Sequence, residues 1–320
     1  MKRDLATIAV FAALVAALAA TSDSGVLLNA VMMTLYAALL AQAWNILGGW
    51  GGQMSFGHAL FFGVGAYASA IAQVSHGWNA WAALAGAVAA AALAGLGVGA
   101  LAFRYGLKGS YFALVTLAFA EVARIVAVSV GFTGGGVGMM LPLQQASGAV
   151  QSGSRHGFVG LVLGLVVVAQ LVGAWLRHSR FGAQLQAVRD NEDAARALGV
   201  DPYRTKLGAI ALSAAFTGAA GAFYLQVFQY IDSGIAFGVQ VSVEALIGAI
   251  VGGLGSLWGP VLGAAVLHLL GECTRNLFGQ LPGLNMVLYG ALLVAIVTFM
   301  PRGLAGLGRT LREAWRGRRG

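Results

Sequence analysis

The sequence predicts an all-α fold, a polytopic bundle of about 8–10 transmembrane helices with Gly-rich broken or re-entrant segments. Of 320 residues, 59% are hydrophobic and only 9% are charged, whereas an ordinary soluble domain has about 25% charged residues. Glycine accounts for 48 residues but proline for only 5. Small residues let helices approach closely in lipid, so this glycine content fits a packed membrane bundle better than a disordered chain.

Ten apolar runs are candidate spans because each is close to the length that crosses the hydrocarbon core. The first follows Lys2 and Arg3 and also resembles a signal peptide. We expect it to be a retained span, since further spans follow at once. The ten candidates are 5–20, 26–47, 59–74, 80–103, 111–130, 158–176, 207–230, 241–256, 258–272 and 284–300.

Basic residues gather on one side of this predicted topology. Sixteen of the nineteen Lys and Arg residues lie before residue 4, in 104–108, in 177–206 or in the tail from 302. The positive-inside rule assigns that side to the cytoplasm, so both termini are predicted to be cytoplasmic and the number of crossings to be even. Ten spans satisfy this parity, and so do eight spans with a re-entrant pair at 241–272. This placement also explains the net charge of +8 without nucleic acid.

Two Gly-rich segments interrupt the apolar pattern, one at 48–65 and one at 252–263. Such interruptions in both halves of a membrane protein are typical of inverted repeats around a central pathway. The alternative is that the two segments resemble each other by chance, because glycine is so frequent in this chain. The segment 253–260 also predicts a broken helix.

The loop 177–206 is the main polar segment. It holds six of the nineteen basic residues and four of the eleven acidic ones. Apolar residues at helical spacing predict one amphipathic helix over 183–198, which Gly199 and Pro202 end. This helix is either a solvated surface helix or a docking helix for a partner. We assign 1–304 to a single membrane domain and 305–320 to a basic cytoplasmic tail.

Ionisable and polar residues inside spans are candidate pathway or gate residues, because they are costly in lipid. Glu121 and Arg124 form either an ion pair that fixes packing or part of a solute path. Glu244 lies either at the interface or on the path, and a lone His58 is more often a packing residue than a ligand. The full set is Asn45, Gly51, Ser55, Phe56, Gly57, His58, Glu121, Arg124 and Glu244.

Motifs for catalysis are missing from the sequence. It has no P-loop, no His, Cys, Asp or Glu cluster at metal-ligand spacing, and no nucleophile with a base nearby. The single Cys273 excludes an internal disulfide. We therefore predict a protein that is not an enzyme and has no catalytic residue, bound cofactor or metal.

Five separated motifs carry a family resemblance. The string Arg189 to Gly199 resembles the coupling loop of ABC importer permeases, and 43–59 resembles the signature of branched-chain amino acid permeases. The stretches 108–119, 133–138 and 299–304 are also similar to the LivM-like subunit of that family. The resemblance runs from about residue 26 to 304. It implies ATPase-coupling roles for Arg189, Asn191, Glu192, Ala194, Ala195 and Gly199.

The resemblance also implies the function and the partners. The chain is expected to be an inner-membrane permease subunit of a bacterial ABC importer for branched-chain or related small amino acids. Its expected partners are a LivH-like permease subunit, two ABC ATPase subunits that use ATP and Mg, and a periplasmic solute-binding protein. The alternatives are a permease of the same family for urea or short amides, and an ion-coupled secondary transporter in which Glu121 is the acid within the membrane.

Overall fold

The computed structural model describes residues 1–141 and 155–278, together with 283, 287–288, 290–291, 294 and 303–306. Within these residues the chain is almost wholly helical, and the predicted all-α polytopic bundle is confirmed. The only strands there are β1 (Met139–Met140) and β2 (Tyr230–Ile231), which pair antiparallel with Met139 opposite Ile231. Most of the predicted span 284–300, and the tail beyond residue 306, lie outside the described residues.

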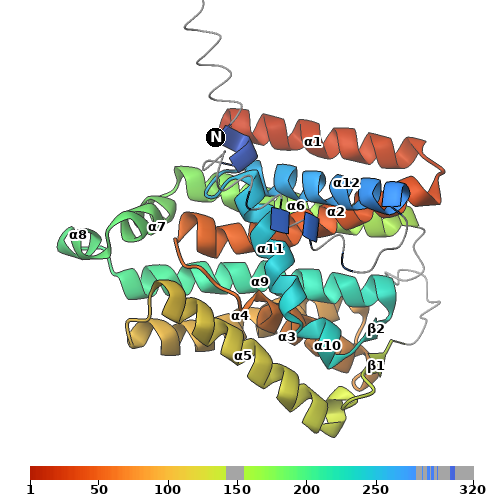
Figure 1. The fold of residues 1–320 in the computed structure, drawn as a ribbon, viewed down its shortest axis with the longest axis horizontal. Helices are drawn as coiled ribbons and strands as arrows, with labels where there is room; N and C mark the ends of the chain where they lie inside the picture. The colour runs from red at the N-terminus through yellow and green to blue at the C-terminus, as the bar shows by residue number, and fades with distance from the viewer. Residues whose placement is uncertain are drawn as a thin grey trace, which may run out of the picture.

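The helices follow the apolar pattern of the sequence (Figure 1). Short helical turns also occur at η1 (Ile46–Trp50), which is π-helical, and η2 (Gly131–Thr133). The α-helices are α1 (Lys2–Thr21), α2 (Gly25–Asn45), α3 (His58–Val74), α4 (Ala80–Arg104), α5 (Gly109–Ser129), α6 (Arg155–His178), α7 (Arg180–Asp190), α8 (Glu192–Ala197), α9 (Pro202–Phe228), α10 (Ser233–Ala236), α11 (Val239–Gly252) and α12 (Gly259–Phe278).

Seven helical segments of the described chain are long and apolar enough to cross a membrane: α1, α2 with η1, α4, α5, α6, α9, and Ser233–Gly252. Two predicted spans form shorter apolar helices, α3 and Gly259–Glu272. Helix α3 is short because residues 51–57 before it stay non-helical. The bundle is therefore built from full spans and from partial spans that border unwound backbone.

Two of the predicted span boundaries that differ from the structure have a clear local cause. The span predicted at 241–256 ends its helix at Gly252, because Gly253 has a φ of 115°, which only glycine adopts readily. The span predicted at 207–230 begins earlier, at Pro202. There the Asp201 carboxylate accepts hydrogen bonds from the backbone N–H groups of Tyr203 and Arg204, a strong N-terminal cap, with proline in the first turn.

The single helix predicted over 183–198 is wrong. The structure has two helices, α7 and α8, separated at Asn191, whose φ of −158° and ψ of 108° are extended. The Asn191 side chain accepts hydrogen bonds from the N–H groups of Asp193 and Ala194, which caps α8. A side chain that bonds the backbone locally thus outcompetes continuation of the helix. Gly199, with a φ of 83°, ends α8 as expected.

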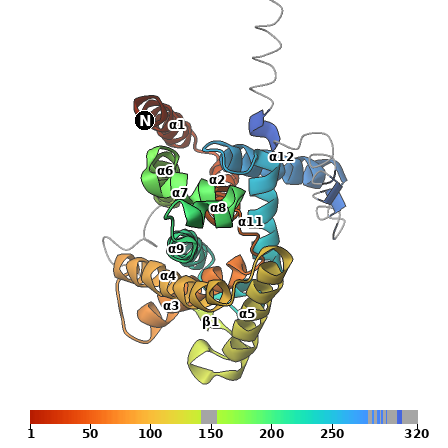
Figure 2. The ribbon, with the colours of Figure 1, turned by 90° about the vertical axis from the view of Figure 1, so that its left-hand side faces the viewer.

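The view along the bundle shows α9 between the pair α3 and α4 and the pair α2 and α6 (Figure 2). Helix α1 lies at the periphery against α6, and α5, α11 and α12 occupy one side. Glycines bring α3 and α9 close together: a Cβ on Gly65 would meet the backbone of Gly218. This tight triple contact of α3, α4 and α9 is the packing that small residues allow in a membrane.

Helices α7 and α8 project from one end of the bundle, and β1 and β2 lie at the opposite end (Figure 1). The start of α1 lies at the α7 end, because Asp4 Oδ1 is 3.2 Å from Arg177 Nη1 and its Oδ2 is 2.7 Å from His178 Nε2. At the other end, His156 Nε2 is 3.3 Å from the carbonyl oxygen of Ser22. Residues 177–206 and Arg155, at the start of α6, therefore lie at opposite ends of the bundle.

Gly65→Ala tests the close packing of α3 and α9. We expect it to destabilise the protein by about 1–3 kcal/mol, because the new methyl group meets backbone atoms that cannot move separately. Gly97→Ala is the matched control: Gly97 is exposed on α4 and a Cβ there meets nothing within 4 Å. Thermal unfolding in detergent measures both, and equal melting temperatures would contradict the packing argument.

Candidate functional site

The two Gly-rich segments of the sequence lie against each other in the structure. Asn45, at the end of α2 and only 3% exposed, joins them. Its Oδ1 accepts the Gly255 N–H at 2.8 Å, and its Nδ2 donates to the Ser256 carbonyl at 3.1 Å. A Cβ on Gly49 would lie 2.6 Å from the Gly255 nitrogen. We call this contact of 45–52 with 253–256 the glycine joint.

Arg189 fastens α7 to the glycine joint. Its Nη1 donates to the carbonyl oxygen of Gly49 at 3.0 Å. Its aliphatic stem lies where a Cβ on Gly52 would be, and Gly52 has a φ of 66°. Both the space and the backbone conformation therefore require glycine at this position. Arg189, predicted for ATPase coupling, thus connects the end of the bundle that bears α7 and α8, called the polar end below, directly to the glycine joint.

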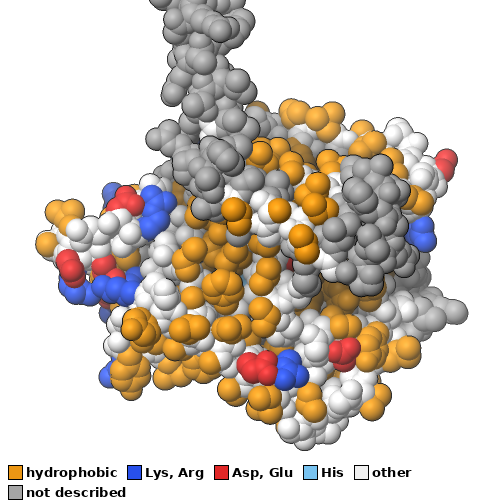
Figure 3. Space-filling model, viewed as in Figure 1, with side chains coloured by type: hydrophobic (Ala, Val, Ile, Leu, Met, Phe, Trp, Pro, Cys, Tyr) orange, Lys and Arg blue, Asp and Glu red, His pale blue; other side chains and the backbone are white. Residues whose placement is uncertain are grey.

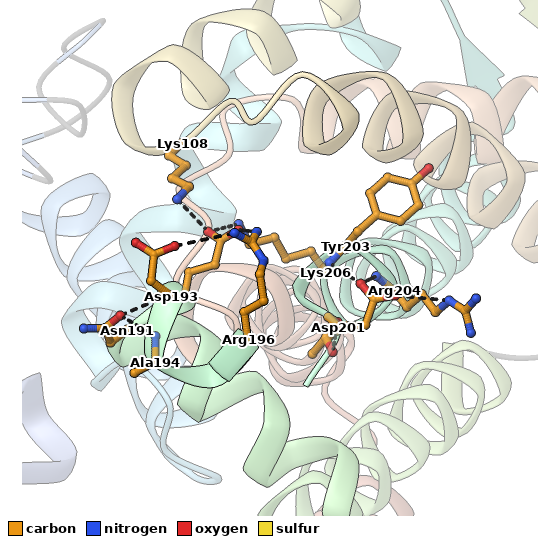
Figure 4. Close-up of polar contacts among 11 residues, drawn as sticks. Lys108, Asn191, Asp193, Ala194, Arg196, Asp201, Tyr203, Arg204 and Lys206 are labelled. Atoms are coloured by element: carbon orange, nitrogen blue, oxygen red, sulfur yellow. Dashed lines mark hydrogen bonds and ion pairs between the residues drawn. The ribbon is translucent and has the colours of Figure 1, made fainter. Parts of the chain in front are cut away.

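Glu192 is the centre of a second connection between α8 and the bundle, and its partners Lys108, Arg196 and Lys206 are labelled in Figure 4. Its Oε2 is 2.7 Å from Lys206 Nζ and 3.0 Å from Lys108 Nζ, and its Oε1 is 3.4 Å from Arg196 Nη2. Lys206 is only 4% exposed, and its ammonium lies 5.6 Å from the centre of the Phe103 ring. One carboxylate therefore ties α8 to α9 and to Lys108, the residue that precedes α5.

The electrostatics of this cluster favour a charged Glu192. Burial alone raises the pKa of the Glu192 carboxyl group. The hydrogen bonds and positive charges of Lys206 and Lys108 outweigh that effect and hold the pKa below its ordinary value of 4.5. The carboxylate is thus ionised at neutral pH and the ion pairs are complete.

The other predicted coupling residues shape α8 itself. Asn191 caps it, Ala195 is 2% exposed and packs inward, and Ala194 is exposed. The prediction did not include Leu198, which follows α8 and is 83% exposed, a large apolar side chain in water. Leu198 is the last apolar residue of the helix predicted over 183–198, and that pattern predicts an inward side chain. The break at Asn191 changes the helical phase, so the periodicity could not reveal this exposure.

Residues 51–57 form unwound backbone, and side chains bond several of its polar groups. Trp44 Nε1 donates to the carbonyl oxygen of Ser55 at 2.8 Å, and the Gly57 N–H donates to Ser55 Oγ at 3.1 Å. Ser55 is fully buried and Gly51 is buried as well. Non-helical backbone inside a membrane protein needs such internal partners.

The start of α3 is held by two other helices. Thr116 Oγ1 on α5 accepts the N–H of Phe56 at 3.2 Å, and Ser242 Oγ on α11 accepts the N–H of Ala59 at 2.8 Å. Sequence analysis missed Thr116 and Ser242, along with Lys108 and Lys206. Each is an ordinary residue of its span or loop, and its partner is far away in the chain.

His58 has a structural environment. It is fully buried, and its Nε2 is 2.8 Å from Ser213 Oγ. Because the Ser213 hydroxyl donates its one hydrogen to the Ala43 carbonyl at 2.7 Å, His58 Nε2 must be the donor in the first contact. Among the residues that the structure describes, no group of three His, Cys, Asp or Glu could hold a metal. His58 thus joins α3 to α9 and α2.

Glu121 and Arg124 form the predicted ion pair, with Nε to Oε2 at 2.9 Å and Nη2 to Oε1 at 2.6 Å. Both side chains point outward from the chain: Glu121 is 48% exposed and Arg124 is 37% exposed. Figure 3 shows an acidic and a basic side chain together over α5 on a largely apolar face. This charged pair therefore lies on the outer surface of this chain.

Glu244 lies on α11 in a small pocket that α2 and α12 complete through Ala37 and His268. The candidate span there is Ser233–Gly252, and Glu244 lies near the middle of that segment. The structure thus divides the predicted pathway residues. Asn45, Gly51, Ser55, Gly57 and His58 are buried in or beside the glycine joint, Phe56 is half-buried, and Glu121, Arg124 and Glu244 border the surface or a pocket.

A bundle of apolar helices that surrounds unwound, internally satisfied backbone and carries a polar helix pair at one end has the architecture of a membrane transport permease. The family described as the permease component of branched-chain amino acid transport systems matches residues 26–297. The chain belongs to this family of ABC transporter permeases and is LivM-like.

Curated relatives agree with this assignment. The LivM permease of the high-affinity branched-chain amino acid system of Escherichia coli K12 is 30% identical over 302 residues, which cover 87% of this chain and 69% of the relative. Escherichia coli LivH is 23% identical over 294 residues, covering 87% and 94%. The Klebsiella pneumoniae autoinducer 2 import permease LsrC is 34% identical over 126 residues, covering 37% of each. No solved structure matches the chain.

Asn45→Ala tests the glycine joint. The variant leaves the N–H of Gly255 without its partner, and we expect a loss of about 1–3 kcal/mol in stability. Asn29→Ala on the same helix is the control, because the exposed Asn29 has no partner among the described residues. If thermal unfolding gave both variants the same melting temperature, the joint would not contribute to stability.

Acidification tests the Glu192 cluster. Folding lowers the pKa of Glu192, so the ionised carboxylate stabilises the folded protein fully at neutral pH. This stabilisation is lost as the pH falls below 4.5 toward the pKa of Glu192 in the folded protein. A spin label at Leu198→Cys, with Cys273→Ser, should become mobile over that range. Glu192→Gln should give a mobile label already at pH 7, because the contact between α8 and the bundle loses about 1–3 kcal/mol of stability.

Asp193→Asn is the control for this acid transition, since the side chain of Asp193 is 85% exposed. It should keep the label immobile at pH 7. Equal label mobility in wild type and Glu192→Gln at neutral pH would show that this cluster does not anchor α8.

Proposed function

We propose that this chain is the permease subunit of an ABC importer that moves branched-chain or related small amino acids across a bacterial inner membrane. In this proposal a periplasmic solute-binding protein delivers the solute. A separate pair of ATPase subunits uses ATP and Mg to drive transport. The observation that carries the proposal is the pair α7 and α8, which projects from one end and is fastened at Glu192 and Arg189 to three parts of the bundle.

The polar end is assigned to the cytoplasm. Lys108, Arg177, Lys206 and the start of α1 all lie there, as the positive-inside rule requires of cytoplasmic segments. On this assignment the N-terminus is cytoplasmic, and so is the C-terminal tail if the crossings are even in number. The end with β1 and β2 then faces the solute-binding protein.

The proposed docking surface for an ATPase is the exposed side of α8. The Leu198 side chain is almost fully exposed and contacts solvent at the tip, where an apolar anchor is suited to enter a pocket on a partner. The Glu192 ion pairs behind it make α8 a stiff lever. When the ATPase subunits move, α8 would carry α9 and the start of α5 with it, and the Arg189 contact would move the glycine joint.

The face that bears α5 is assigned to the second, LivH-like permease subunit. A charged pair exposed to lipid within a span is costly, and both side chains of Glu121 and Arg124 are exposed on this chain alone. A partner subunit on that face would remove the pair from lipid, and the solute path would then run between the two subunits.

Permeases of this kind differ in the solute that their names give, and one similar permease is named for autoinducer 2 import and not for an amino acid. The alternative for this chain is therefore another small solute. A permease for urea or a short amide would use the same fold. An ion-coupled secondary transporter is favoured less, since Glu121, its expected acid, is already neutralised by Arg124.

Copurification with the candidate ATPase tests the docking surface. Leu198→Asp should reduce recovery of the ATPase at least roughly tenfold, because a charge replaces the apolar anchor of a desolvated pocket. Glu192→Lys should also reduce recovery, since it places a third cation against Lys108 and Lys206.

Two variants serve as controls for this experiment. Leu198→Met keeps an apolar side chain and should bind as wild type does. Val137→Asp makes the same kind of change at a residue that is 82% exposed at the opposite end. Normal ATPase recovery with Leu198→Asp would rule out α8 as the docking element.

A further inference from the structure

The pocket around Glu244 combines one carboxylate with a mostly apolar lining, to which Gln240 and the imidazole of His268 add polar groups. Its volume is about 40 Å³, room for a group the size of one water molecule, whose share of the liquid is about 30 Å³. Val243, Ile247 and Leu267 contribute apolar surface, and Gln240 lies one helical turn before Glu244 at the exposed mouth. The pocket belongs to α11, which lies with α5 on the side proposed to face the second permease (Figure 2).

Glu244 differs from the other acidic residues of the described helical spans. Asp4 pairs with Arg177 and His178, Glu121 pairs with Arg124, and Glu272 Oε1 lies 3.9 Å from His268 Nε2. Glu244 has no hydrogen bond or ion pair within the described residues. A carboxylate in the middle of a span without a positive partner is expensive and by default marks a functional site.

The chemistry of the missing partner follows from the pocket. A carboxylate in apolar surroundings is stabilised by a cation that donates hydrogen bonds. The small volume admits an ammonium group but not a whole amino acid. The apolar residues beside Glu244 suit an aliphatic chain attached to that ammonium.

We propose that Glu244 binds the ammonium group of a zwitterionic solute during its passage through the permease. This inference rests on the proposed function and adds to it a recognition group within the membrane. The solute's amino group enters the pocket between α11 and α12, and its aliphatic side chain lies against Val243 and Ile247. Recognition of amino acids is then shared between the solute-binding protein and the permease.

The test uses the complete transporter in proteoliposomes, with saturating binding protein loaded with leucine. Uptake of leucine and hydrolysis of ATP are measured together. We expect Glu244→Gln to lower the leucine transported per ATP at least tenfold, while the ATPase copurifies normally. Glu244→Asp keeps the charge and should retain a larger share of transport than Glu244→Gln.

Asp23→Asn is the matched control, because it makes the same chemical change at an exposed residue before α2, and it should transport as wild type does. Unchanged leucine transport per ATP in Glu244→Gln would overturn the inference and leave the proposed function standing. So would equal losses of transport in Glu244→Gln and Glu244→Asp, because that result indicates a packing role. A wild-type transporter that moves acetamide but not leucine would instead overturn the proposed function.

Discussion

The structure depends on one constraint: a backbone that leaves the helical conformation inside a membrane must find every hydrogen bond within the protein. The chain unwinds at 51–57 and at 253–258. Trp44 and Ser55 supply partners from nearby in the chain. Asn45 reaches 253–258 from the end of α2, and Thr116 and Ser242 reach the segment before α3 from α5 and α11. The positions of α3, α5 and α11 follow from these few side chains, because each contact fixes one helix to the unwound segment.

The same constraint brings the polar end into contact with the membrane core of the protein. Gly49 has no side chain in the glycine joint, and Arg189 reaches its carbonyl oxygen. Glu192 makes the second contact through Lys108 and Lys206. A displacement of α7 and α8 is thus felt at the joint, at α9 and at the start of α5, whereas a loop held by one contact could move by itself.

Much of the fold could be predicted from the sequence, because long apolar runs and the grouping of Lys and Arg depend only on local composition. The Gly-rich hinge at 253–260 and the Glu121–Arg124 pair were also predictable, since each involves residues that are close in sequence. The break at Asn191 was not, because a cap and a helix interior can share one apolar pattern. Partners such as Lys108 and Glu192 are 84 residues apart, and no local rule pairs them. The outward orientation of Glu121 depends on how α5 packs, which spacing does not determine.

Leu198 has a consequence for biogenesis. Leu198 is 83% exposed and follows a short helix of six residues, so under the proposed function a permease chain that has not met an ATPase presents this side chain to water. An exposed apolar group is the kind of feature that chaperones and proteases recognise in incomplete assemblies. Docking would hide it, so the residue that serves transport in the finished complex would also mark the unassembled subunit for removal, and would help keep the subunits in balance.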